Sequence, residues 1–110
     1  MLWKMVDKIM NTSPTRINEQ QAQDLADLFS ALSDPTRLRI LSTLLDNELS
    51  VQEIASQIGM SHSAVSHQLG SLRQTRVVKA QKRGRQVFYA LDDQHVSDLL
   101  LRGLDHIFHG

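Results

Sequence analysis

The chain has 110 residues, 41% of them hydrophobic, and its 12 basic and 12 acidic residues give a formal net charge of zero. The absence of cysteine excludes disulfides, thiolate metal ligands and thiol redox switches. No apolar run reaches the roughly 18 residues of a membrane helix and no signal-peptide pattern is evident, so we expect a small cytoplasmic protein without a membrane segment.

The zero net charge conceals an uneven distribution along the chain. Residues 54–91 contain six basic residues and no acidic residue, whereas the segments before and after them each carry a net charge of −3. An acid-free basic segment in a neutral protein favours a surface that binds a polyanion, although a solvated patch has the same composition.

The N-terminal half is expected to be helical. We assign residues 1–15 to a tail or short helix and residues 16–110 to one domain, because "NTSPT" interrupts the apolar pattern. A first helix follows Ile17, with apolar positions at Leu25, Leu28, Phe29 and Leu32. A second begins at the N-cap Asp34, with Pro35 in the first helical position and an apolar stripe at Leu38, Leu41 and Leu45.

The next two helices form a helix-turn-helix pattern. Ser50 and Glu53 have the spacing of a capping box at the start of the third helix, and Gly59 is suited to end it. Ser61 then caps a fourth helix, whose apolar residues are Val65, Leu69 and Leu72. A short helix, a glycine-containing turn and a second helix are typical of DNA-binding domains.

In the C-terminal third, the spacing of apolar residues changes from that of a helix to that of a strand. The segments 78–81 and 86–91 predict two strands around the turn "KRGR", a β-hairpin with a basic tip. Asp92 is then expected to cap a last helix that ends near Gly110. The predicted fold class is therefore mainly α with a β-hairpin wing, a winged helix-turn-helix. Because so small a core is marginal alone, we also expect the chain to form an oligomer.

The side of the fourth helix opposite its apolar stripe is polar, as contact with bases in a major groove requires. Its candidate DNA-binding residues are His62, Ser63, Ser66, His67 and Arg73. At the hairpin tip, Lys82, Arg83 and Arg85 could reach phosphates or the minor groove. An ordinary polar helix face is the alternative for these residues.

Three histidines share one strip of the last helix. At 100° per residue, His95, His106 and His109 lie within about 60° of one another, at the edge of an apolar stripe. His95 and His106 are about 16 Å apart along the axis, too far to share one metal ion within a chain. An antiparallel second copy, crossing near Gly103, would complete two equivalent sites, each with Asp93 and His95 from one subunit and His106 and His109 from the other.

The acidic ligand depends on local geometry. On a regular helix Asp93 and His95 would point about 160° apart, so they converge only if Asp93 has non-helical backbone geometry. Asp98 is the alternative oxygen ligand. Three nitrogens and one carboxylate oxygen suit tetrahedral Zn²⁺, with Co²⁺ as a mimic. His62 and His67 lie on the DNA side and are not counted as ligands.

Several stretches resemble the ArsR/SmtB family of winged-helix metal-sensing repressors. They are "ALSDPTRLRILSTLL", "SVQEIASQIGMSHSAVSHQLGSLRQTRVVKAQKRGRQVFYAL" and the C-terminal tail, which together cover about residues 20 to 109. "SHSAVSHQL" is similar to the recognition helix of the zinc-sensing branch. The family's C-terminal-helix sensors carry D-x-H-x10-H-x2-H, and Asp93, His95, His106 and His109 match all four positions.

The resemblance implies a function. Ser63, Ser66 and His67 would contact bases, the wing would contact the backbone, and a homodimer joined through its first and last helices would bind an imperfect inverted repeat. The apo-protein would repress transcription, and metal would release it from DNA. The cysteine-containing site of other members is absent, which disfavours arsenic, cadmium, lead and copper(I).

Three alternatives remain open. The chain could be a regulator of the same family that senses another signal or none. A hydrolytic zinc enzyme would need an open coordination position and a general base, neither of which is evident, so we expect no enzyme activity. A pure dimerisation module would leave the basic segment 54–91 without a role.

Overall fold

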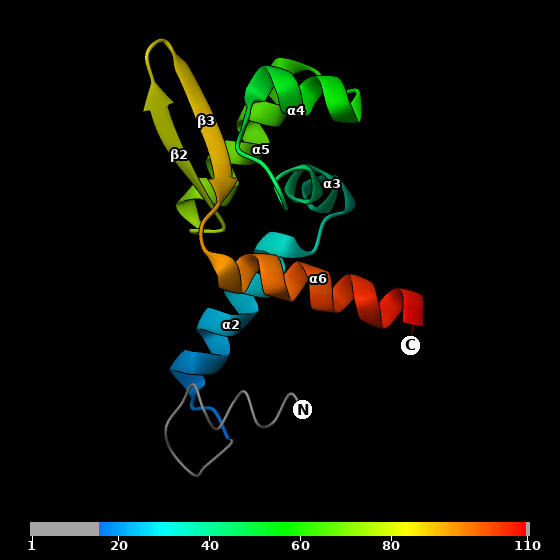
Figure 1. The fold of residues 1–110 in the computed structure, drawn as a ribbon. Helices are drawn as coiled ribbons and strands as arrows, with labels where there is room; N and C mark the ends of the chain where they lie inside the picture. Colours follow the sequence, from blue (N-terminus) through cyan, green and yellow to red (C-terminus); the bar gives the residue numbers. More distant parts are fainter. Residues whose placement is uncertain (1–15, 110) are drawn as a thin grey trace.

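The computed structural model describes residues 16–109. Its elements, in chain order, are α2 Glu19–Leu32, α3 Pro35–Thr43, β1 Leu49–Ser50, α4 Val51–Ile58, α5 His62–Gln74, β2 Val78–Arg83, β3 Gln86–Leu91 and α6 Gln94–His109. The predicted tail or short helix of residues 1–15 lies outside the described residues. In Figure 1, α3, α4, α5 and the base of the hairpin gather on one side of α6, while α2 and the C-terminal part of α6 project away from them. The mainly helical fold with a hairpin wing is confirmed.

Side-chain caps fix where the helices begin. Asp34 accepts a hydrogen bond from a backbone N–H of α3, and Ser61 does the same for α5, as predicted. Ser50 and Glu53 form the predicted capping box, with distances of 2.9 and 3.2 Å between side chain and backbone. Gly59 ends α4 in the left-handed conformation, with φ 71°, which a glycine adopts at low cost.

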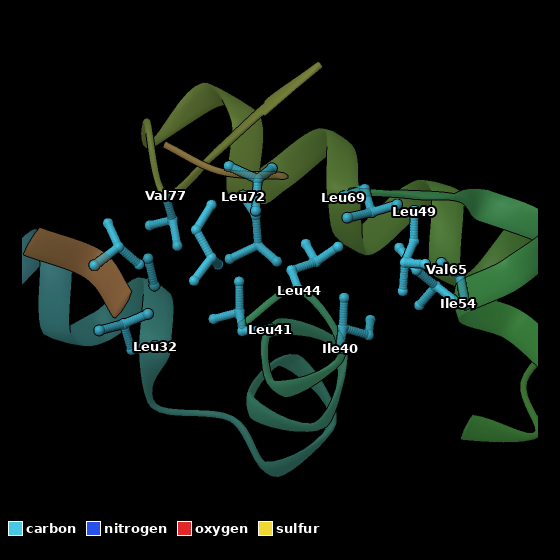
Figure 2. Packing of buried hydrophobic residues seen from close by; sticks show 14 of the residues in the cluster. Leu32, Ile40, Leu41, Leu44, Leu49, Ile54, Val65, Leu69, Leu72 and Val77 are labelled. Carbon is cyan, nitrogen blue, oxygen red and sulfur yellow. The ribbon is translucent and has the colours of Figure 1, made fainter. Parts of the chain in front are cut away.

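The core lies between α3, α4, α5 and the base of the hairpin (Figure 2). The predicted apolar stripe of α5 is confirmed, because Val65, Leu69 and Leu72 are fully buried. The predicted stripe of α3 is partly wrong. Leu41 is buried, but Leu38 is 41% exposed, while Ile40 is fully buried in the core. Leu38 instead lines an open groove beside α6.

The wing is a three-stranded antiparallel sheet in the order β1-β3-β2. The hairpin register runs from Val78↔Leu91 to Arg83↔Gln86, so the turn consists of Gly84 and Arg85 alone. Lys82 and Arg83 therefore belong to β2 and not to the loop that the sequence indicated. The two-residue β1 was not predicted, because a strand this short has no periodicity to detect.

The start of α6 differs from the expectation by one residue. Asp93, not Asp92, caps the helix, since its Oδ1 accepts hydrogen bonds from the backbone N–H of His95 (2.9 Å) and Val96 (3.2 Å). The N–H of Asp92 donates to the carbonyl of Val77 at 2.9 Å and holds that residue to the end of the sheet. Among the helices of residues 16–109, none is long and apolar enough to cross a membrane.

Candidate DNA interface and metal-ligand helix

The predicted recognition helix is α5. Its core residues anchor one side against the domain, and its N-terminus is held by the Ser61 cap at 3.1 Å from the N–H of Ala64. The five candidate DNA-contacting residues of this helix are all solvent-exposed: His62, Ser63, Ser66, His67 and Arg73. No acidic residue occurs in its first turn, so the positive end of the helix dipole is not neutralised there.

The three wing cations do not have equivalent surroundings. Arg83 forms an ion pair with Glu48, with 2.5 Å between Nη2 and Oε1, and its guanidinium lies 5.5 Å from the centre of the Phe88 ring. Within the described part of the chain, no ion pair involves Lys82 or Arg85. Consecutive strand residues point to opposite faces, so Lys82 extends away from the Arg83 side. A phosphate approaching Arg83 would have to compete with Glu48.

Asp93 and His95 lie together at the start of α6. Because Asp93 precedes the helix, its Oδ2 reaches within 3.5 Å of His95 Nδ1, and both side chains are at least half exposed. The pKa of Asp93 is lowered, chiefly by the hydrogen bond from the Val96 backbone N–H and to a smaller extent by His95. The carboxylate is thus held in the ionised form that binds a metal ion.

The other two candidate ligands occupy the opposite end of α6. His106 and His109 are both exposed in its last turns, and His109 Nε2 lies 3.7 Å from Asp105 Oδ1. Within residues 16–109 of one chain, no group of three or more histidine or acidic side chains converges closely enough to hold a metal ion. One chain therefore presents two half-sets of candidate ligands, Asp93 with His95 and His106 with His109, which are separated by about 16 Å along the helix axis.

An apolar groove runs along α6 between these half-sets. Its volume is about 410 Å³, and residues of α2, α3, α6 and the segments just after α2 and α3 line it: Phe29, Leu32, Ser33, Leu38, Ser42, Leu45, Leu99, Leu100, Gly103, Leu104 and Ile107. Ile107 is 75% exposed and Phe29 49%. A Cβ placed on Gly103 would meet no atom of residues 16–109 within 4 Å. A continuous exposed apolar surface of this kind is typical of a protein interface.

Sequence reasoning missed two polar contacts beside these surfaces. Asp105 lies one helical turn before His109, and this i,i+4 spacing was available in the sequence. Glu48 pairs with Arg83 across 35 positions of the chain, and no local signal could have indicated that pairing. Both residues modify the surroundings of a candidate functional group.

Sequence comparison relates the chain to known regulators. Residues 34–80 match the profile of the bacterial regulatory proteins of the arsR family. The chain is 43% identical over 102 residues to a transcriptional repressor SmtB homolog from Synechocystis sp., covering 93% of this chain and 77% of that protein. It is 39% identical over 99 residues to the HTH-type transcriptional regulator NmtR of Mycobacterium tuberculosis, covering 90% and 82%.

Solved structures show the same similarity. The solution structure of apo-NmtR matches with a TM-score of 0.76 at 39% identity, over 90% of this chain and 82% of that one. The homodimeric winged helix-turn-helix DNA-binding domain of a possible ArsR-family transcriptional regulator from Mycobacterium bovis matches with a TM-score of 0.74 at 26% identity, over 86% and 94%. The similarity therefore extends well beyond the helix-turn-helix itself.

Proposed function

The chain belongs to the arsR family of bacterial regulatory proteins, and from that membership we propose that it is a homodimeric repressor whose operator affinity falls when Zn²⁺ binds between its subunits. Its relatives are transcriptional regulators, so the chain is a regulator and not an enzyme. The observation that carries the metal proposal is the arrangement of α6, with Asp93 and His95 converging at one end and two histidines at the other.

A second copy of α6 in antiparallel orientation would bring the two half-sets together. The exposed apolar side chains along the groove favour such packing, and the open space at Gly103 favours a close approach at the crossing point. Each site would then contain Asp93 and His95 from one subunit with His106 and His109 from the other. Three imidazole nitrogens and a carboxylate are a suitable tetrahedral set for Zn²⁺, and Co²⁺ would serve as a spectroscopic substitute.

The bound metal would supply bonds that cross the subunit interface. Such bonds restrict how the two α6 helices move against each other. They would thereby also restrict the distance between the two α5 helices. A dimer on DNA must hold these helices about one turn of the duplex apart, roughly 34 Å. If the metal-bound dimer departs from this spacing, the metal weakens DNA binding, and the operator must weaken metal binding by the same factor.

The exposed positions of the candidate residues on the fold support the proposed DNA contacts. Ser63, Ser66 and His67 would contact base edges in the major groove, with His62 and Arg73 beside them on the exposed side of α5. Lys82, Arg83 and Arg85 of the wing would contact the phosphate backbone. The operator is expected to be an imperfect inverted repeat, because it must match a two-fold symmetric dimer, and the protein would act in the cytoplasm.

The deciding experiment is a DNA-binding titration by fluorescence anisotropy with and without one Zn²⁺ per subunit. The DNA is an operator that the wild-type protein has selected from random duplexes. We expect Zn²⁺ to weaken wild-type binding by about 5- to 150-fold, the usual range of coupling between two sites. His106→Ala should bind DNA as the apo wild type does and show no zinc effect.

Asp98→Asn is the matched control for the acidic ligand. It should keep the zinc response, whereas Asp93→Asn should weaken it. The reverse result would move the oxygen ligand to Asp98. If zinc leaves the DNA affinity of the wild type unchanged, the metal-responsive function is wrong, and the protein regulates transcription through another signal.

A further inference from the structure

One arginine of α3 joins three separate elements. The Arg37 guanidinium donates to Gln68 Oε1 of α5 at 2.9 Å and to the Ala31 carbonyl of α2 at 3.2 Å, and it approaches Ser71 Oγ of α5 at 3.4 Å. Its own backbone N–H is held by Asp34 Oδ2 at 3.0 Å. These contacts bridge up to 34 positions of sequence, so no local pattern reveals them.

The groups that accept hydrogen bonds from Arg37 belong to two different helices, α2 and α5. The last four carbonyls of a helix have no partner within it, and Ala31 supplies one such carbonyl at the end of α2. Gln68 follows His67 on the recognition helix but lies half-buried on the side that faces α3. Arg37 thus connects the helix that lines the groove with the helix that carries the candidate base contacts.

We propose that Arg37 is a positioning residue for DNA recognition, which fixes α5 relative to α2 and thereby sets the distance between the two recognition helices of the dimer. The proposal depends on the dimeric DNA-binding function described above. The planar guanidinium holds several donors in fixed directions, so it can orient three acceptors at once. Its donors are directed at protein acceptors, which leaves DNA contact to the exposed side of α5.

Arg39 provides a matched comparison two residues further along α3. Its Nη2 donates to the Ile58 carbonyl at 3.2 Å, at the C-terminal end of α4, and its side chain is exposed. Among the described residues, its side chain makes no hydrogen bond to α5 or α2. Substitution of Arg39 changes charge and side-chain length in the same helix without removing the connection that Arg37 makes.

The test measures tolerance to half-site spacing. The operator selected by the wild-type protein is compared with two versions whose half-sites are one base pair closer or one base pair further apart. The wild type should discriminate against both altered operators, because each shifts and rotates one half-site relative to the other. For Arg37→Met we expect the discrimination to fall about tenfold, the factor expected for losing one charge-assisted hydrogen bond.

Three further variants separate positioning from other roles. Arg37→Lys should fail to restore discrimination, since one ammonium cannot replace the guanidinium fork. Gln68→Met should reduce discrimination in the same direction, and the double variant Arg37→Met with Gln68→Met should be no worse than Arg37→Met alone, because Arg37→Met already removes the contact with Gln68. Arg39→Met should keep the wild-type spacing preference.

Each remaining outcome has a defined meaning. Should Arg37→Met reduce the salt dependence of DNA binding by about one counterion, the side chain contacts a phosphate and the positioning role is wrong. Unchanged discrimination in both Arg37→Met and Gln68→Met also overturns it. If Arg37→Met does not fold, Gln68→Met alone decides. A wild-type protein that selects no operator refutes the proposed function itself, a result independent of these variants.

Discussion

Asp93 has two roles that substitutions can separate. Its carboxylate caps α6 and also lies beside His95, where it is the proposed oxygen ligand. Asp93→Ala should lower the free energy of unfolding by about 1 kcal/mol, the typical value of an N-cap, whereas Asp93→Asn should lower it by only a fraction of that. Both should weaken zinc binding. Urea unfolding and a zinc competition titration measure the two effects, and equal destabilisation by Ala and Asn would contradict the capping role.

The same residue predicts a pH dependence. The Val96 backbone N–H, followed by His95, lowers the pKa of Asp93 below that of an unfolded aspartate. A carboxyl with a lowered pKa stabilises the folded state above its unfolded pKa, about pH 4, and this contribution is lost as the pH falls through the lowered value. The metal-free Asp93→Asn protein should therefore lose less stability than the wild type between about pH 5 and pH 2. Identical pH profiles would show that Asp93 does not titrate with folding.

At the scale of elements, the wing and the loop before β1 are joined by the Glu48–Arg83 ion pair. Both side chains are well exposed, so the pair should contribute little to stability, at most about 1 kcal/mol. Its removal by Glu48→Gln should leave the melting temperature nearly unchanged but strengthen operator binding a few-fold, about 0.5–1 kcal/mol, because Arg83 becomes available to phosphate. Asp46→Asn removes a charge from the same loop without releasing Arg83. If both variants strengthen binding equally, the effect is general charge and not the release of Arg83.

In the helix-turn-helix, the residues that set the helix boundaries lie close to those boundaries in the sequence. The Ser50–Glu53 capping box, the left-handed Gly59 and the Ser61 cap each act within four residues, and all three are as predicted. The wing was predicted less accurately. Its hairpin was expected, but the strand boundary at Lys82 and Arg83 depends on pairing with Gln86 and Val87.

At the scale of the whole molecule, the groove beside α6 predicts a dimer. Leu104 and Val87 are each 39% exposed, but only Leu104 lines the groove. Leu104→Asp should place a charge in the proposed interface and shift the protein to monomer, while Val87→Asp should leave it dimeric. Sedimentation equilibrium over a range of concentrations distinguishes the two. A dimeric Leu104→Asp protein would place the interface elsewhere.

The exposed surface of α2 is explained at this scale too. The helix that its apolar positions predicted is present, yet Leu25 is 42% exposed and Phe29 49%. Within α2, only Ala31 and Leu32 are buried. In Figure 1 this helix projects from the body, and among residues 16–109 its apolar side chains at Leu25 and Phe29 stay largely exposed. Periodicity indicates which side of a helix is apolar, but it does not distinguish a core from an interface.

The sequence by itself determined the order of the helices and the hairpin, the caps of α3, α4 and α5, the buried stripe of α5 and the residue types of both candidate sites. Each of these follows from interactions between residues a few positions apart, or from the 100° step of a helix. Only the tertiary structure decided that Asp93 caps α6, that Glu48 neutralises Arg83 and that Arg37 joins α2 to α5. The contacts of Glu48 and Arg37 bring together residues far apart in the chain. The start of α6 lies one residue later than the sequence predicted, because Asp92 is hydrogen-bonded to Val77 at the end of the sheet.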